Sequence, residues 1–182
     1  MDVTLSIKQA YQKLPNNNDI YLAYVVAIKD PLNIHLDIFL PSEMEKRYAT
    51  ASNYNYMFMS EELDKYIYTR KAYLCHLKGV EIISNEHEKI NTKEAYNIIN
   101  SIIIKYNGWI LVSTSDIDIY NRILINIYDI ITKEDINKKL LETKSQLTGE
   151  NIAKPYLRNN TKNLFKPNET FDDYYIVYEN CY

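Results

Sequence analysis

The chain contains few of the residues from which the commonest functional motifs are built. Only three glycines occur among 182 residues, and none belongs to a glycine-rich loop of the kind that cradles phosphate groups. The two cysteines, Cys75 and Cys181, form neither a disulfide framework nor a Cys-x-x-Cys zinc spacing. We therefore interpret both as reduced thiols, and we expect a cytoplasmic or other reducing compartment.

An excess of one charge and long apolar runs are also absent. The 21 basic and 24 acidic residues leave a net charge of -3, so no whole-molecule field attracts a polyanion. No apolar run approaches the length that spans a bilayer, and residues 1–8 lack the features of a signal peptide, so we expect no membrane association. The 46% hydrophobic content is sufficient for the core of one domain. The abundance of Tyr, Ile, Asn and Lys is typical of an AT-rich coding genome, such as that of a large DNA virus or an AT-rich microbe.

The first half of the chain favours strands. Residues 20–28 are rich in β-branched and aromatic side chains and are bounded by turn residues, which predicts a buried strand. Residues 33–39 alternate between apolar and polar, with His35 and Asp37 on the polar face, which predicts a half-buried strand. The residues between them, from Asp30 to Leu32, predict a hairpin turn. A further strand is expected at 73–78.

The second half alternates helices with a hairpin. A helix is predicted over 93–107, with Thr92 as its N-cap and Gly108 as its stop. A strand at 109–112 leads into a turn and strand over 116–129. A second amphipathic helix is predicted from Thr132 to near Gly149, with Ile136, Leu140 and Leu141 facing inward. This periodicity alone predicts an α+β protein.

Residues 42–70 interrupt the pattern. A short helix is predicted over 43–47, followed by a long loop that is rich in tyrosine, and long loops in compact domains are usually functional. Basic and acidic side chains balance in this segment. Tyrosine and methionine without net positive charge suit a protein-protein surface better than a nucleic-acid surface. The predicted interaction residues are Tyr48, Tyr54, Tyr56, Phe58, Tyr66 and Tyr68.

The order of elements over 92–147 (helix, strand, hairpin, helix), with the motif Asp118-x-Tyr-x-Arg122 in the hairpin, resembles the C-terminal half of the staphylococcal (thermo)nuclease family. This resemblance implies an α+β fold in which a five-stranded OB-type barrel carries packed helices. A single nuclease-like domain would cover 1–157, with the tyrosine-rich insertion at 42–70, and 158–182 would form a C-terminal extension.

The resemblance also implies where a calcium site would lie. Enzymes of this family cleave phosphodiesters with one Ca²⁺ that carboxylates hold, because a hard cation prefers oxygen ligands. Asp30 matches the first metal carboxylate, whereas Leu32 occupies a position at which the family has a ligand. Glu81 stands at the next ligand position, so the candidate metal residues are Asp30 and Glu81.

The catalytic positions match less well. Arg122 matches the family's second phosphate-binding arginine, but His76 stands where the first belongs, and Ser84 replaces the glutamate that activates water. The candidate catalytic residues, Arg122, Glu81 and His76, are therefore interpreted as vestigial. Groups of this kind act as a unit, so losing several of them would cost many orders of magnitude in rate.

Three functions follow from these patterns. The preferred hypothesis is a non-catalytic, nuclease-like binding or assembly module in a larger complex, a virion included, with no cofactor and with protein partners at 42–70 and the C-terminal extension. The first alternative is a calcium-dependent nuclease with a remodelled active site. The second is a single-strand nucleic-acid binder that does not cleave, and its candidate surface consists of Lys138, Lys139, Lys144, Lys154 and Arg158.

Overall fold

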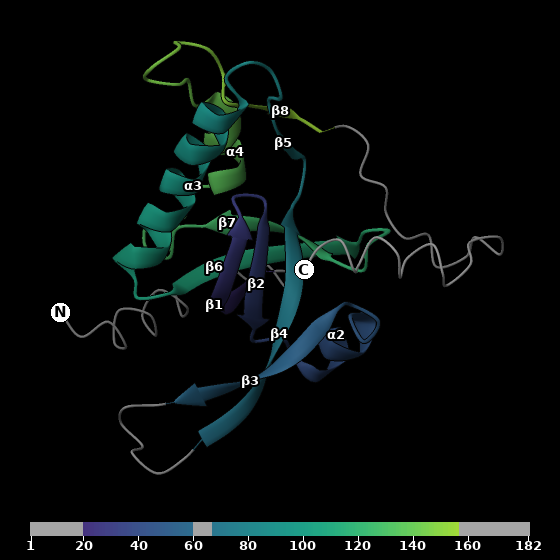
Figure 1. Cartoon of the computed structure of the whole chain (residues 1–182). Coiled ribbons are helices and arrows are strands. Elements are labelled where there is room, and N and C mark those ends of the chain that lie inside the picture. The colour runs from purple at the N-terminus through teal and green to yellow at the C-terminus, as the bar shows by residue number, and fades with distance from the viewer. Residues whose placement is uncertain (1–19, 60–66, 157–182) are drawn as a thin grey trace, which may run out of the picture.

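The computed structural model describes residues 20–59 and 67–156, and its centre is a closed barrel of five strands (Figure 1). Neighbouring strands follow the order β1, β2, β4, β7, β6, and β6 pairs with β1 to complete the ring. The β4–β7 pair is parallel, whereas the other four pairs are antiparallel. The strands are β1 (Ile20–Asp30), β2 (Asn33–Ile38), β4 (Ile67–Leu77), β6 (Trp109–Ile117) and β7 (Ile123–Tyr128).

Three helices and a small second sheet accompany the barrel in the described part of the chain. The helices are α2 (Ser42–Arg47), α3 (Glu88–Lys105) and α4 (Ile136–Glu142), and the second sheet pairs β5 (Val80–Ile82) with β8 (Ala153–Pro155). The expected α+β class and a five-stranded barrel compatible with an OB-type fold are thus confirmed. Over the same residues, no helix is long and apolar enough to cross a membrane.

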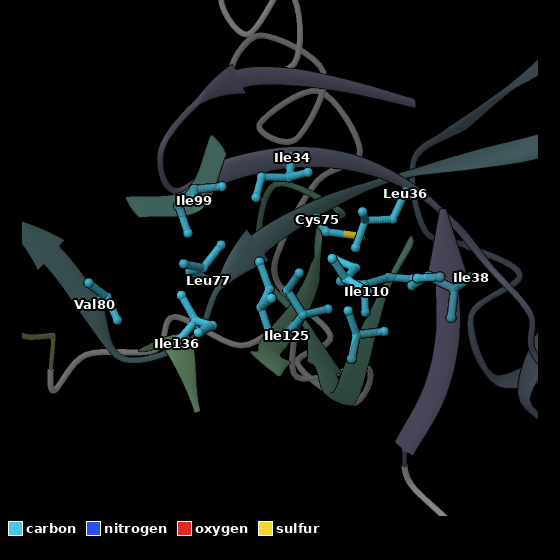
Figure 2. Packing of buried hydrophobic residues seen from close by; sticks show 14 of the residues in the cluster. Ile34, Leu36, Ile38, Cys75, Leu77, Val80, Ile99, Ile110, Ile125 and Ile136 are labelled. Atoms are coloured by element: carbon cyan, nitrogen blue, oxygen red, sulfur yellow. The ribbon is translucent and has the colours of Figure 1, made fainter. Parts of the chain in front are cut away.

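The core lies inside the barrel and continues under the helices. The alternation of β2 is confirmed on its apolar face, since Ile34 and Leu36 are fully buried and Ile38 is nearly so. Figure 2 shows these side chains packing with residues from the other strands and from α3 and α4. Ile136 and Leu140 of α4 are also fully buried, and Leu141 packs partly against the same core, as the sequence predicted.

An arm of two strands extends the sheet beyond the barrel. β3 (Asn53–Met59) pairs with residues 67–73 of β4, while residues 73–77 of β4 belong to the barrel. In Figure 1 this arm projects away from α3 and α4. The expectation of a loop after the short helix is therefore wrong over these residues, which form a regular antiparallel pair.

The helix boundaries differ from those predicted. α3 begins at Glu88 rather than at 93, and Thr92 lies inside the helix, so Thr92 is not the N-cap. Asn91 in the first turn is buried, and its side chain donates to the Ile83 carbonyl oxygen at 3.0 Å, which ties the start of α3 to the end of β5. α4 is capped by Asp135, not by Thr132, because the Asp135 side chain accepts from the backbone N–H of Lys138. It ends at Glu142, well before Gly149.

Candidate functional site

The three candidate catalytic residues line one cavity of about 220 Å³ at the end of the barrel. His76 comes from the end of β4, Arg122 from the β6–β7 turn, and Glu81 from β5. Leu32, from the β1–β2 turn, also lines this cavity. The fold therefore brings these residues together from distant parts of the chain, with Leu32 among them.

The β6–β7 turn fixes the position of Arg122. The Asp118 carboxylate accepts from the backbone N–H groups of Tyr120 and Arg122, both at 2.9 Å, and from Nε of Arg122 at 2.7 Å. Asn121 adopts a φ of 61°, a left-handed conformation that asparagine tolerates in tight turns. The guanidinium also lies 5.0 Å from the centroid of the Tyr120 ring. The motif Asp118-x-Tyr-x-Arg122 is thus a hydrogen-bonded turn with an ion pair whose two side chains are largely shielded from solvent.

Asn33 connects Arg122 to His76 and to Asp30. Its amide nitrogen donates to Oδ2 of Asp30 at 2.7 Å, which fixes the amide orientation and leaves Oδ1 as the acceptor. That oxygen accepts from Nη1 of Arg122 at 2.5 Å and contacts Nδ1 of His76 at 2.9 Å. Because Oδ1 can only accept, His76 carries its proton on Nδ1, and its Nε2 keeps a lone pair. No sequence pattern indicated this role for Asn33, because it depends on the pairing of β2 with β4.

The imidazole of His76 is neutral in this environment. Burial, followed by the positive charge of Arg122, lowers the pKa of His76 to about 4. A neutral imidazole adds no positive charge to that of Arg122. The cavity therefore carries one guanidinium, and Asp118 already balances its charge.

This pKa predicts a loss of stability in acid. The pKa of His76 is lowered in the folded state, so below pH 6.5 the unfolded chain binds a proton that the folded chain refuses, and stability falls toward pH 4. Between pH 7 and pH 5, we expect the unfolding free energy of His76→Gln to decrease by about 2 kcal/mol less than that of the wild type. Urea titrations at the two pH values measure this, and an equal decrease in both proteins would contradict it.

The two candidate metal residues lie apart and have other partners. Oδ1 of Asp30 accepts from the backbone N–H groups of Leu32 and Asn33, which closes the β1–β2 turn. Asp30 lines a second cavity of about 180 Å³, with Arg122 in the wall of both cavities. The Glu81 carboxylate is half-exposed and lies 3.9 Å from Nζ of Lys154. Within 20–59 and 67–156, no three His, Cys, Asp or Glu side chains gather as a metal site would require.

The predicted interaction residues fall into three groups. Tyr48 is only 1% exposed and belongs to the core, so its assignment to an interaction surface is wrong. Tyr54 and Tyr56 are half-buried on β3, where their hydroxyls contact Nδ1 of His35 at 2.9 Å and Oδ2 of Asp37 at 2.5 Å. The side chains of Phe58, Tyr66 and Tyr68 lie outside the described residues.

The tyrosines of β3 cover the face of β2 that was expected to be polar and exposed. Asp37 is buried there, and Arg70 of β4 donates to both of its carboxylate oxygens at 2.8 Å. Tyr56 donates to the same carboxylate, and burial together with this hydrogen bond raises the pKa of Tyr56. The polar face of β2 is therefore covered by the arm, and Asp37 is paired there with Arg70 and Tyr56.

Arg70 also joins a strip of aromatic rings that the sequence did not predict. Its guanidinium lies 4.2 Å from the centroid of the Phe39 ring, and the Phe39 and Trp109 centroids are 5.5 Å apart. Tyr24 contacts Trp109 edge to face at 5.2 Å. We call Tyr24, Trp109, Phe39, Arg70 and Tyr56 the aromatic strip. It was missed because Tyr24 of β1 meets Trp109 of β6 only through strand pairing.

The candidate nucleic-acid residues do not form one unpaired basic surface. Lys138, Lys139 and Lys154 lie 3.9, 3.6 and 3.9 Å from the carboxylates of Glu142, Glu134 and Glu81. Lys144 lines a separate groove beside α3. Arg158 lies outside the described residues.

Comparisons with known proteins do not indicate a function, so the proposal for function rests on the geometry described above. No family model and no curated protein matches this chain.

Proposed function

We propose that this chain is a non-catalytic barrel of the staphylococcal nuclease type that serves as a protein-binding module in a larger assembly, and that the aromatic strip is its docking surface. The observation that carries this proposal is the strip itself, which spans four strands of the extended sheet and the residue after β2. Trp, Tyr and Arg are the residues that most often dominate the energy of protein interfaces.

The strip is held in place before any partner binds. The Asp37 carboxylate, 3% exposed, accepts two hydrogen bonds from Arg70 and one from Tyr56. Because these bonds anchor the arm to β2, the aromatic rings lose little freedom on binding. Such preorganisation favours affinity by reducing the entropy that association costs.

The charge of the strip favours a protein partner over nucleic acid. Asp37 balances the one basic side chain of the strip, Arg70, so few counterions would be released from a bound polyanion. Phe39 is 37% exposed, and Tyr24, Tyr56 and Trp109 are half-buried. Half-exposed aromatic side chains around a neutralised guanidinium resemble the centre of a protein-protein interface.

The hydrogen bonds around the cavity of His76, Glu81 and Arg122 support a non-catalytic function. A nuclease centre needs carboxylates that are open to a metal and donors that are open to a phosphate. Here the Asp30 carboxylate closes a turn, and Arg122 donates to Asp118 and Asn33. Leu32 occupies the wall of the cavity where a ligand would be needed.

Affinity capture from the chain's native source tests the proposal with two matched variants. Phe39→Ser changes the strip, whereas Ile104→Ser changes an exposed side chain on α3 that is 65% exposed and lies outside the strip. We expect Phe39→Ser to reduce the yield of the captured partner at least tenfold and Ile104→Ser to leave it unchanged. Equal yields from both variants would contradict a docking role for the strip.

One observation favours a second candidate, a calcium-dependent nuclease. His76, Glu81 and Arg122 line a single cavity, as the family resemblance implies, and Nε2 of His76 keeps a lone pair that could accept a proton. In this alternative, Glu81 and Asp30 would hold calcium and Arg122 would contact the phosphate. It ranks second because Asp30 and Glu81 line different cavities.

A further inference from the structure

The surface carries a larger groove, with a volume of about 650 Å³, that shares no lining residue with the cavity of His76, Glu81 and Arg122. One wall is the N-terminal half of α3, and the other is the loop that follows α4. Figure 1 shows this loop beside the upper end of α3. We call it the basic groove, and the residues that matter for its chemistry are Lys89, Ile90, Lys93, Ile98, Lys144 and Leu147.

The basic groove combines positive charge with exposed apolar surface. Lys89, Lys93 and Lys144 are exposed, and Glu94 is the one acidic side chain in its lining. Glu94 is engaged by Ser145, whose hydroxyl donates to it at 2.8 Å. Leu147 is 77% exposed, an unusual exposure for a leucine that lines a concave surface. An occupant that is both acidic and aromatic would match this lining.

The chain itself contains a segment of that composition. Residues 169–179 read Glu-Thr-Phe-Asp-Asp-Tyr-Tyr-Ile-Val-Tyr-Glu, with four acidic side chains, no basic one and six large apolar or aromatic ones. The rest of the C-terminal part differs, since Lys162 and Lys166 precede this segment. Within residues 157–182, the segment that complements the basic groove is therefore 169–179.

The length of the intervening chain permits this contact within one molecule. The described chain ends at Tyr156, and residues 157–168 connect it to the acidic segment. Twelve residues can extend to about 40 Å, whereas a domain of this size has a radius of gyration of about 14 Å. A short tether also gives an effective concentration in the millimolar range, so a weak contact suffices.

We propose that residues 169–179 bind in the basic groove of the same molecule. The groove follows α3 from Lys89 to Ile98, about 14 Å at the rise of a helix, which matches about four extended residues such as Phe171 to Tyr174. Because successive side chains of an extended segment point to opposite sides, one of Asp172 and Asp173 faces Lys89 and Lys93 on α3 and the other faces Lys144 on the opposite wall. The flanking aromatic rings cover Ile90, Ile98 and Leu147. This inference is independent of the aromatic strip, which lies on the barrel and its arm.

Paramagnetic broadening in the full chain tests this contact. Cys75 is 1% exposed and burial raises the pKa of its thiol, so a nitroxide reagent under native conditions is directed to Cys181, next to the acidic segment. We expect amide signals of residues 89–98 to lose more than half their intensity. A mixture of isotope-labelled chain without nitroxide and unlabelled chain with nitroxide should show no such loss, because the contact is intramolecular.

Charge reversal provides the control. Lys89→Glu with Lys93→Glu should restore the amide intensities, and adding Asp172→Lys with Asp173→Lys should bring the broadening back. Lys138→Glu, outside the groove on α4, should leave the broadening as in the wild type. Three results would each overturn the proposal: no selective broadening at 89–98, broadening that survives the reversal in α3, or broadening that appears equally in the mixed sample.

Discussion

Replacing Asn137 by alanine is expected to lower the free energy of unfolding by about 3 kcal/mol. This buried side chain on α4 accepts from the backbone N–H of Ile127 at 3.0 Å and donates to the carbonyl oxygens of Lys78 and Ile125, also at 3.0 Å. Ile125 keeps a second donor, the backbone N–H of Lys78, so the main cost comes from the other two backbone groups. Burying unpaired backbone groups costs about 1–3 kcal/mol each.

Urea unfolding of Asn137→Ala and of Asn97→Ala measures this contribution. Asn97 lies exposed on α3, where alanine is a good helix former, so its replacement should change the unfolding free energy by less than about 0.5 kcal/mol. A loss below about 1 kcal/mol for Asn137→Ala would mean that α4 is not anchored to β7 through this side chain. Such a result would also weaken the placement of α4 against the barrel.

Arg70→Met is the second substitution with a large expected effect. It keeps an unbranched side chain over Phe39 but removes the partner of Asp37, whose carboxylate is 3% exposed. Removing one partner of a buried ion pair costs about 3–5 kcal/mol, and we expect about 3 kcal/mol because Arg70 itself is 37% exposed.

The matched control for this substitution is Arg47→Met. Arg47 lies 3.8 Å from Asp116, and both side chains are more than half exposed, so this pair should contribute less than about 1 kcal/mol. Urea titrations of the two variants at pH 7 give the comparison. Equal losses would show that the Arg70–Asp37 pair does not anchor the arm, and the preorganised strip would then have no physical basis.

The parts of the fold that local patterns determine were predictable. The alternation of β2 follows from the period of two in a strand, and the inward face of α4 follows from the helical period at Ile136 and Leu140. The turn from Asp118 to Arg122 was also predictable, because its aspartate accepts backbone N–H groups within five residues. Such features need no knowledge of distant segments.

The errors arise where distant segments meet. Tyr48 looks like a surface aromatic beside charged residues, but the barrel buries it and its hydroxyl donates to the Ser115 carbonyl oxygen at 3.2 Å. Asp37 lies on the polar face of β2, and the sequence gives no sign that β3 covers this face. The start of α3 was placed too late because Asn91, a residue that usually favours a cap or turn, is held by the Ile83 carbonyl.

The candidate site was also predictable only in part. The resemblance predicted a shared site for His76, Glu81 and Arg122, and these residues line one cavity. It gave no indication that Asn33 joins His76 to Arg122. It also could not reveal that the Asp30 carboxylate closes its own turn. Hydrogen bonds between side chains of different strands decide whether such groups remain available for chemistry. These bonds cannot be predicted from one sequence, because they depend on how the strands pair.

The most direct test of the central claim is a calcium titration with fluorogenic single- and double-stranded DNA and RNA, comparing the wild type with Arg122→Ala. Our account predicts no cleavage by either protein at any calcium concentration, with both proteins folded. Calcium-dependent cleavage by the wild type that Arg122→Ala abolishes would contradict it. That result would establish a nuclease in which Arg122 is released from Asp118 and Asn33 to contact the phosphate.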